Sequence, residues 1–168
     1  MLKSHTEVLE QALEIISTMT VEEYQQVLSP HFSGSIGQHI RHIIDHYLAL
    51  EQGALLGHVD YNQRHRASNI ERCKQEATAA IQAIVTWLHG LEPSALGRQI
   101  VIESEVSVIG TQSEQGVSTL GREIMFVSSH AIHHYSLIAI IRSLQGGVVP
   151  ELFGYAPATI SYINHRET

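Results

Sequence analysis

The chain has 168 residues, with 17 Asp and Glu, 10 Lys and Arg and 12 His, so its formal net charge is −7 when the histidines are neutral. This length fits a single domain that buries enough apolar surface to fold alone. DNA- and RNA-binding proteins usually carry a clustered basic face, so we expect no nucleic-acid partner. The single cysteine, Cys73, excludes an internal disulfide and a zinc site made of cysteines.

The N-terminal sequence MLKSHTEVLEQALEI is typical of a helix and lacks the charged-then-apolar layout of a secretory signal. No apolar stretch reaches the ~18 to 20 residues that a membrane span needs. We therefore expect a cytoplasmic protein that does not enter a membrane.

Apolar spacing and cap residues predict the first two helices. Residues 3–28 place apolar side chains about 3.6 positions apart between glutamates, which is the pattern of an amphipathic helix. Pro30 ends this helix. Ser33 or Ser35 can then cap a second helix over about 35–56.

A polar connection separates the second helix from a third one. Ser68 or Asn69 is the expected N-cap, and the helix is expected to end near His89. The following segment, 91–117, is the least helical part of the chain. Its alternating apolar residues fit either a short hairpin or an extended loop.

The last predicted helix runs from Ser118 to Leu144 and is apolar nearly all round, which is typical of a helix in the middle of a bundle. Four helices in sequence, with one longer link between the third and the fourth, predict an all-α four-helix bundle. We expect a single domain over 1–168, with the bundle at about 5–146 and residues 147–168 as a C-terminal strap.

Three histidines stand in the apolar run HAIHHYSLIAII at 130–141. His130 and His134 are four positions apart, so they share one helix face with apolar residues that point into the core. A buried imidazole without a partner is costly. A divalent metal would satisfy both rings, whereas a bond to a carbonyl or hydroxyl is the simpler explanation for one histidine alone. His133 lies off this face and is expected to pack or to support a ligand.

The second predicted helix supplies matching groups, because His39, His42 and His46 follow one another at i, i+3 and i+7. If the two helices are neighbours, one or more of these rings meets His130 and His134. Three imidazoles plus a water in an open position form the ligand set of catalytic zinc sites. The spacing leaves open which histidine of the second helix takes part.

Other polar residues are assigned weaker roles. Asp45 and Glu123 lie beside the histidine stripes and either orient imidazole N–H groups or are solvated surface acids. Tyr47, Tyr135 and His133 are candidate proton donors. The remaining histidines are expected near the surface, at positions His5, His31, His58, His65, His89 and His165.

The segments SIGQHIRHIIDHY (35–47) and REIMFVSSHAIHHYSLIAIIRSLQG (122–146) resemble the DinB-like (DinB/YfiT) superfamily. These four-helix-bundle proteins include bacillithiol transferases and the metal-binding part of mycothiol-dependent maleylpyruvate isomerase. The resemblance covers about residues 5–146. In the family pattern, the ligand of the second helix follows a small residue by about seven positions, which selects His42 when counted from Ser35.

The resemblance therefore implies a divalent ion, zinc or nickel, held by His42, His130 and His134, together with frequent homodimers. His39 and His46 leave the choice of His42 open. Many relatives follow the last ligand with Arg-Gly, whereas Tyr135 and Ser136 stand here. A role for that arginine is therefore not carried over.

The leading hypothesis is a metal-dependent enzyme that activates a low-molecular-weight thiol for S-transfer or water for hydrolysis of a small-molecule substrate. One alternative is a di-iron, hemerythrin-like oxygen or redox protein, although such sites rely on bridging carboxylates and only Asp45 and Glu123 are candidates. The other alternative is a non-catalytic metal-binding module.

Overall fold

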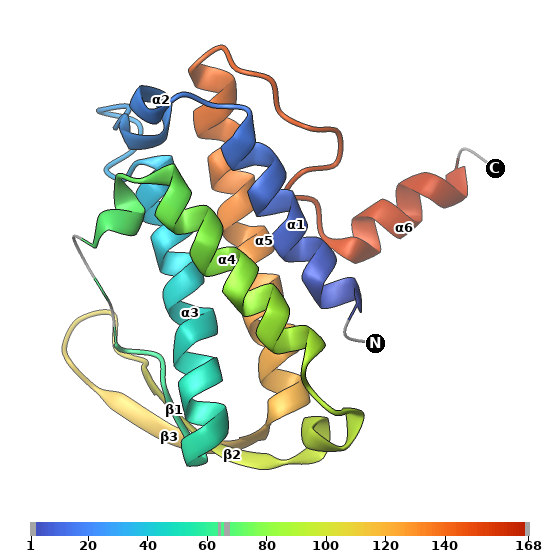
Figure 1. Cartoon of the computed structure of the whole chain (residues 1–168). Helices are drawn as coiled ribbons and strands as arrows, with labels where there is room; N and C mark the ends of the chain where they lie inside the picture. Colours follow the sequence, from blue (N-terminus) through green and yellow to red (C-terminus); the bar gives the residue numbers. More distant parts are fainter. Residues whose placement is uncertain (1–2, 64, 66–67, 167–168) are drawn as a thin grey trace.

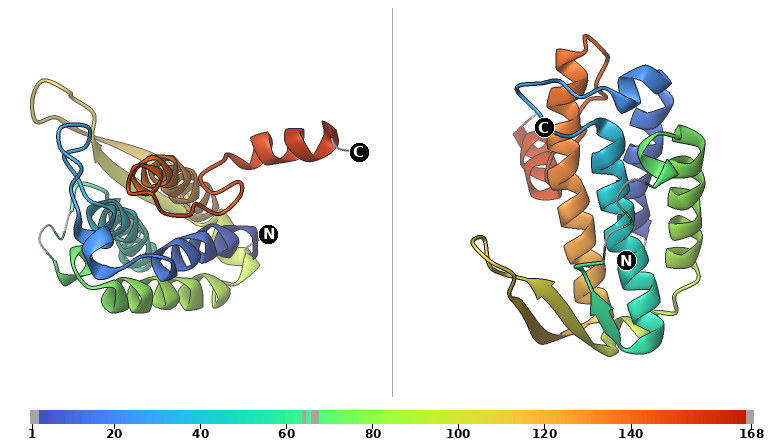
Figure 2. Two further views of the ribbon diagram at one scale, coloured as in Figure 1. Left: turned by 90° about the horizontal axis from the view of Figure 1, so that it is seen from above. Right: turned by 90° about the vertical axis from the view of Figure 1, so that its left-hand side faces the viewer.

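The computed structural model describes residues 3–63, 65 and 68–166, and four long helices of this part lie side by side (Figures 1 and 2). They are α1 (Lys3–Ser17), α3 (Ile36–Leu56), α4 (Lys74–His89) and α5 (Leu120–Leu144). Helices α1 and α3 each contact both α4 and α5, so the four enclose one core. All four contribute buried side chains to it, such as Leu9, Ile44, Ile84 and Ile138.

A small sheet crosses the end of the molecule where α3 ends and α5 begins (Figure 1). Its strands are β1 (His58–Asp60), β2 (Gln99–Glu105) and β3 (Ser113–Thr119). The order is β1-β2-β3, with β1 parallel to β2 and β2 antiparallel to β3. The shorter elements are α2 (Val21–Gln25), the 3₁₀ turns η1 (Asn69–Glu71) and η2 (Pro93–Gly97), and α6 (Pro157–Arg166).

The prediction of an all-α four-helix bundle is wrong, because the described residues form six α-helices and a three-stranded mixed sheet. The hairpin that the sequence left open does form, as β2 and β3. Strand β1 is only three residues long, too short for an alternating pattern to show. Its partner also lies far along the chain, since His58 pairs with Val101.

The first predicted helix is two helices, because a new N-terminus forms within residues 3–28. The Thr20 hydroxyl accepts a hydrogen bond from the backbone N–H of Glu23 at 3.2 Å, and the Glu23 carboxylate accepts one from the N–H of Thr20 at 2.8 Å. This reciprocal capping box satisfies two N–H groups that a helix start leaves unpaired. The apolar spacing continues across the break, so spacing alone did not show it.

Capping residues fix the starts of the two helices that carry the clustered histidines. Ser35, one of the two predicted caps, forms a second capping box with Gln38 at the start of α3. Helix α5 begins at Leu120, one residue after its cap Thr119, whose hydroxyl accepts from the N–H of Arg122. The predicted cap, Ser118, instead belongs to β3.

Helix α5 is long and apolar enough to cross a membrane by length and composition, with a mean hydropathy of 1.4 over its best window. The sequence predicted no such stretch. In the fold, α5 packs against α1 and α3, and it carries buried charged residues such as Glu123 and Arg142. Its place in the core therefore accounts for part of its apolar composition, since 39% of that window is buried.

The C-terminal segment turns back beside the helices before it leaves them. The Phe153 ring stacks on the Tyr135 ring, with centroids 5.0 Å apart and planes at 25°. Helix α6 then has no buried residue and projects away from the other helices (Figures 1 and 2).

Gly53 allows β1 to lie directly against α3. A Cβ atom at this position would overlap the carbonyl oxygen of His58 and the side chain and Cα of Val59. The overlap involves backbone atoms of a strand that is itself paired with β2, so the neighbours cannot simply rotate away. Glycine at 53 therefore sets the distance between α3 and the sheet.

We expect Gly53→Ala to lower the free energy of unfolding by about 1–3 kcal/mol, the usual effect of overpacking. The loss should appear although alanine is by about 1 kcal/mol the better helix former. Urea unfolding followed by circular dichroism measures it. Gly116→Ala is the control, since nothing lies within 4 Å of a Cβ on β3 at that position. Equal stability of the two variants would contradict the proposed close packing.

Candidate metal centre

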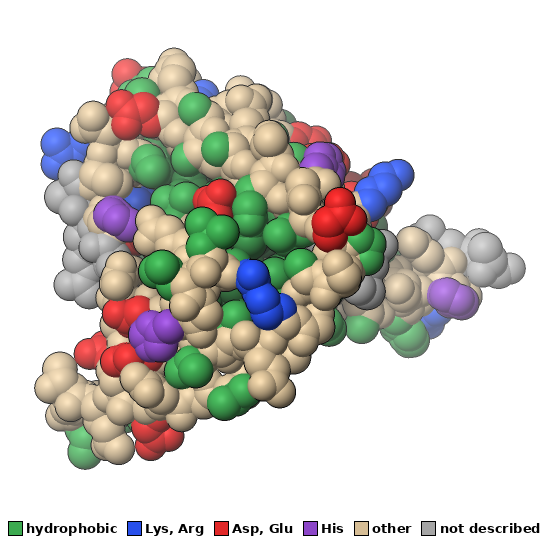
Figure 3. Space-filling model, turned by 60° about the horizontal axis from the view of Figure 1, so that its bottom comes forward, with side chains coloured by type: hydrophobic (Ala, Val, Ile, Leu, Met, Phe, Trp, Pro, Cys, Tyr) green, Lys and Arg blue, Asp and Glu red, His purple; other side chains and the backbone are tan. Residues whose placement is uncertain are grey.

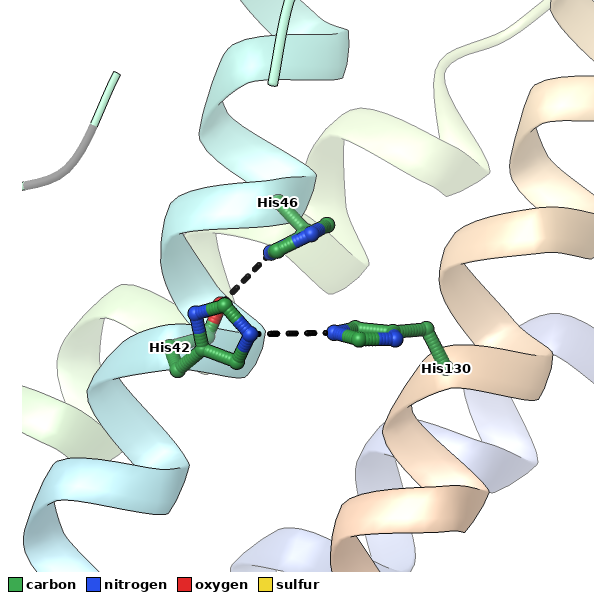
Figure 4. Close-up of side chains that lie close together, drawn as sticks. All are labelled: His42, His46 and His130. Atoms are coloured by element: carbon green, nitrogen blue, oxygen red, sulfur yellow. Dashed lines mark hydrogen bonds between the residues drawn. The ribbon is translucent and has the colours of Figure 1, made fainter. Parts of the chain in front are cut away.

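Five histidine side chains from two helices come together between α3 and α5. Three of them, His39, His42 and His46, follow the predicted stripe on α3, and His130 and His134 lie one turn apart on α5. Figure 4 shows the rings of His42, His46 and His130 meeting in the space between the two helices. His46 is buried and the other four rings are half-buried.

The three residues selected as ligands, His42, His130 and His134, lie next to one another. Nε2 of His130 is 3.1 Å from Nε2 of His42 and 3.2 Å from Nε2 of His134. The ring centroids of His42 and His134 are 4.7 Å apart. A tetrahedral zinc ion with Zn–N bonds of ~2.0–2.1 Å holds neighbouring nitrogens about 3.3 Å apart. Both measured nitrogen separations are close to that spacing, so the residues fit a bound divalent ion.

His46 belongs to the same cluster. Ligand atoms of His42, His46 and His130 all lie within 4.8 Å of one another. Nδ1 of His46 is 2.9 Å from the backbone carbonyl oxygen of His42, one turn earlier on α3. The structure thus brings together two overlapping sets of three histidines that share His42 and His130.

His39 contacts the cluster through His134, with their Nδ1 atoms 2.9 Å apart. Burial, followed by the neighbouring rings of His130 and His39, lowers the pKa of His134 to about 3. Burial and then His133 lower the pKa of His39. The neutral imidazole is the form that binds a metal, so the surroundings of His134 keep it in the ligating form well below neutral pH.

Asp45 is buried, at 4% exposure, and ties α3 to the segment before η1. Its carboxylate lies 2.7 Å from a guanidinium nitrogen of Arg41 and 2.9 Å from Nδ1 of His65. Arg41 also pairs with Glu71 at 3.0 Å. Asp45 is therefore not a solvated surface acid. None of these contacts is a hydrogen bond to one of the clustered histidine rings. Asp45 organises an ion-pair network on a neighbouring face of α3.

Glu123 is likewise buried, at 3% exposure. It accepts a hydrogen bond from the Tyr61 hydroxyl at 2.9 Å and one from the Ser118 hydroxyl at 2.7 Å. The Tyr61 ring stacks on the His46 ring, with centroids 5.4 Å apart and planes at 20°. Glu123 therefore supports the cluster indirectly, by holding the tyrosine that packs on His46.

Two aromatic residues that the sequence did not single out form the wall of the cluster. Besides Tyr61 on His46, the Phe126 ring stacks on His130 with centroids 5.9 Å apart. Burial and the Glu123 carboxylate raise the pKa of Tyr61. No sequence signal marked Tyr61, because it lies in a polar connection and reaches the histidines only through the pairing of β1 with β2.

The candidate proton donors Tyr47 and Tyr135 are engaged inside the core. The Tyr47 hydroxyl lies 3.2 Å from the Ser128 hydroxyl, and burial raises its pKa to about 12. The Tyr135 hydroxyl donates to the Val8 carbonyl oxygen at 2.8 Å. The third candidate, His133, is exposed, although its ring lies 5.3 Å from that of His134.

Of the histidines expected at the surface, five are exposed and one is half-buried: His31, His58, His65, His89 and His165 are exposed, and His5 is half-buried. Nδ1 of His5 lies 2.9 Å from the Ser128 hydroxyl.

A cavity of about 550 Å³ lies between the sheet and the first turns of α5. Tyr61 and Phe126 line it, and polar groups of Ser118, Arg122 and Glu123 face it as well. The same two aromatic rings contact the histidines, so the cavity adjoins the cluster. Figure 3 shows the molecule with this end turned forward: Lys and Arg side chains lie apart from one another, and Asp and Glu side chains gather near the hairpin.

Comparisons with known proteins support the family resemblance. A crystal structure of a DinB-like protein from Bacillus cereus superposes with a TM-score of 0.61, covering 90% of this chain and 95% of that chain. The two are 15% identical, so the match shows the shared fold.

FK506-binding protein 5 of Rhizopus delemar is 30% identical over 108 residues, which is 64% of this chain but 28% of the fungal protein. This chain therefore spans little more than a quarter of that relative. The model of the DinB superfamily matches residues 4–138, which is most of the sequence and includes all five clustered histidines. The chain therefore belongs to the DinB superfamily.

Proposed function

We propose that this protein is a metal-dependent enzyme in which His42, His130 and His134 hold a divalent ion, zinc or nickel. The ion would activate a low-molecular-weight thiol for transfer to an electrophile, or water for hydrolysis. The observation that carries the proposal is the spacing of the Nε2 atoms, at 3.1 Å and 3.2 Å around His130. Imidazole suits both metals, so the ligands alone do not select one.

When bound, such an ion lowers the pKa of a coordinated thiol or water and so supplies a nucleophile near neutral pH. The residues of the chain provide the surroundings for this chemistry. Neutral imidazoles leave the full positive charge of an ion in place, because they bring no negative charge of their own. The rings of Tyr61 and Phe126 limit the access of water to His46 and His130.

The adjoining cavity is the proposed place for the organic part of the substrate. Its volume of about 550 Å³ is in the range of small-molecule sites, ~300–1,000 Å³. It offers aromatic surface from Tyr61 and Phe126 and charged groups from Arg122 and Glu123. A small molecule with an apolar body and a few polar groups fits this lining. Homodimer formation and a cytoplasmic location remain predictions.

The di-iron alternative gains no support from the site. Its bridging ligands would have to be Asp45 and Glu123. Asp45 is paired with Arg41 and His65, and Glu123 accepts hydrogen bonds from Tyr61 and Ser118. A visible spectrum of purified protein distinguishes the two cases, because a colourless protein with zinc or nickel excludes di-iron.

We expect the purified protein to bind about one zinc or nickel ion per chain and His130→Ala to lower the affinity at least 100-fold, since Nε2 of His130 contacts two other ligands. Elemental analysis after dialysis against a competing chelator measures this. His133→Ala, an exposed imidazole on the same helix, is the matched control and should keep wild-type affinity. Wild-type metal content in His130→Ala would refute the site.

The catalytic part of the proposal predicts turnover by the metal-loaded protein. A small electrophile offered with a cysteine-like thiol or bacillithiol should yield the thiol adduct, and activated esters test the hydrolytic version. His134→Ala should abolish turnover while its circular dichroism spectrum remains that of the folded, helical protein. If the loaded protein turns over none of these substrates, the enzymatic proposal fails; a large drop in Tm for His134→Ala would then indicate a structural ion.

The lowered pKa of His134 predicts that acid lowers the free energy of unfolding of the metal-free protein. The pKa of His134 is about 3 in the folded state and near 6.5 when unfolded, so the unfolded chain binds more protons between these values. The free energy of unfolding should therefore fall as the pH drops from 6.5 towards 3. Urea titrations at several pH values measure the slope. His134→Leu should flatten it, and an unchanged slope in this variant would contradict the assignment.

A further inference from the structure

We propose that His46 is a fourth protein ligand, so that the resting ion is enclosed by His42, His46, His130 and His134. This inference rests on the proposed metal site and adds to it. The three-histidine pattern of the family does not include His46.

The pairing of the two helices places four imidazoles opposite one another. Helices α3 and α5 run antiparallel (Figure 1), and each carries two histidines one turn apart. His46 therefore faces His130, with ring centroids 4.3 Å apart, and His42 faces His134, with centroids 4.7 Å apart. The diagonal pair His42 and His130 has centroids 5.1 Å apart. Across the helix interface, His42 and His130 thus each neighbour the other three rings of this set.

The hydrogen bond of His46 sets its tautomer. A backbone carbonyl oxygen can only accept, so Nδ1 of His46 must be the donor in the 2.9 Å contact with the His42 carbonyl (Figure 4). The proton of the neutral ring is then on Nδ1, and the lone pair is on Nε2. Histidine ligands of metals are commonly oriented by this kind of bond. His46 is therefore held in the protonation form that a ligand needs.

Packing also holds the His46 ring in place. Its exposed fraction is 8%, and the Tyr61 ring stacks on it at 5.4 Å. Tyr61 is itself anchored, because its hydroxyl donates to Glu123 at 2.9 Å. A chain of contacts thus runs from a buried carboxylate on α5, through the end of β1, to the imidazole on α3. Such support is typical of a side chain whose orientation matters.

Four protein ligands around one ion have a chemical consequence. Structural zinc sites are closed by four protein ligands, whereas catalytic sites keep one position for water or substrate. A resting shell of four imidazoles leaves no position for the water that hydrolysis requires. A thiol that loses its proton would bind as a thiolate, which is a stronger zinc ligand than a neutral imidazole; it could displace His46, whose freed Nε2 could take up that proton. The closed shell therefore favours a thiol over water as the molecule that is activated.

X-ray absorption spectroscopy of the zinc-loaded full chain tests the assignment. We expect four imidazoles in the wild type, and three imidazoles with one oxygen in both His46→Ala and His46→Gln, with a loss of zinc affinity of at least 10-fold. His46→Gln keeps most of the side-chain volume, so one variant remains informative if the other folds poorly. His133→Ala is the control and should retain four imidazoles.

A second readout uses cobalt in place of zinc. Azide should leave the visible spectrum of the cobalt-loaded wild type unchanged and should shift that of His46→Ala, where a position is open. The proposal is overturned if the wild type shows three imidazoles and an oxygen, or if His46→Ala keeps wild-type affinity. If the four-ligand proposal is overturned in this way, a loss of zinc from His130→Ala would still support the three-histidine site. If His130→Ala also keeps wild-type zinc affinity, both the four-ligand proposal and the three-histidine site are overturned.

Discussion

The structure depends on the close approach of several imidazole nitrogens between α3 and α5, where the His46 ring is buried and the other clustered rings are half-buried. Two neutral rings in contact can share one proton, but Nε2 of His130 has ring nitrogens on two sides, at 3.1 Å and 3.2 Å. Adding protons is disfavoured, as the lowered pKa of His134 shows. A divalent cation would satisfy several of these lone pairs at once. The proposed ion would account for the histidine positions on α3 and α5.

The rest of the fold sets the distance between α3 and α5 and the position of each helix along its axis relative to the other. Capping at Ser35 and Thr119 fixes where each helix begins, and so which turn of α3 faces which turn of α5. The sheet closes the end of the bundle and brings Tyr61 against His46. Gly53 lets β1 approach α3 closely enough for this contact. The small sheet at the end of the bundle thus contacts the candidate site through Tyr61, the residue that follows β1.

The sequence predicted a substantial part of this arrangement. Helical spacing identified the faces of α3 and α5 that carry the histidines, and family resemblance selected His42, His130 and His134, which lie adjacent in the structure. Residue spacing shows which face of a helix carries a side chain. It does not show how far one helix is shifted along its axis relative to its neighbour, so the position of His46 opposite His130 was not predictable. Strand β1 and Tyr61 were missed for a related reason: β1 is short and depends on a strand far along the chain.

The separation of the facing histidines along the chain has a consequence for folding. His42 and His130 are 88 positions apart, and everything between them, including α4 and the sheet, forms a loop closed by this pair. A disulfide of similar span would stabilise the fold by restricting the unfolded chain, by roughly 4–5 kcal/mol. An ion bound only by the folded chain would instead add its binding free energy to the free energy of unfolding. A chain with one cysteine has no such covalent link within itself. Coordination between α3 and α5 would act as a reversible crosslink in its place.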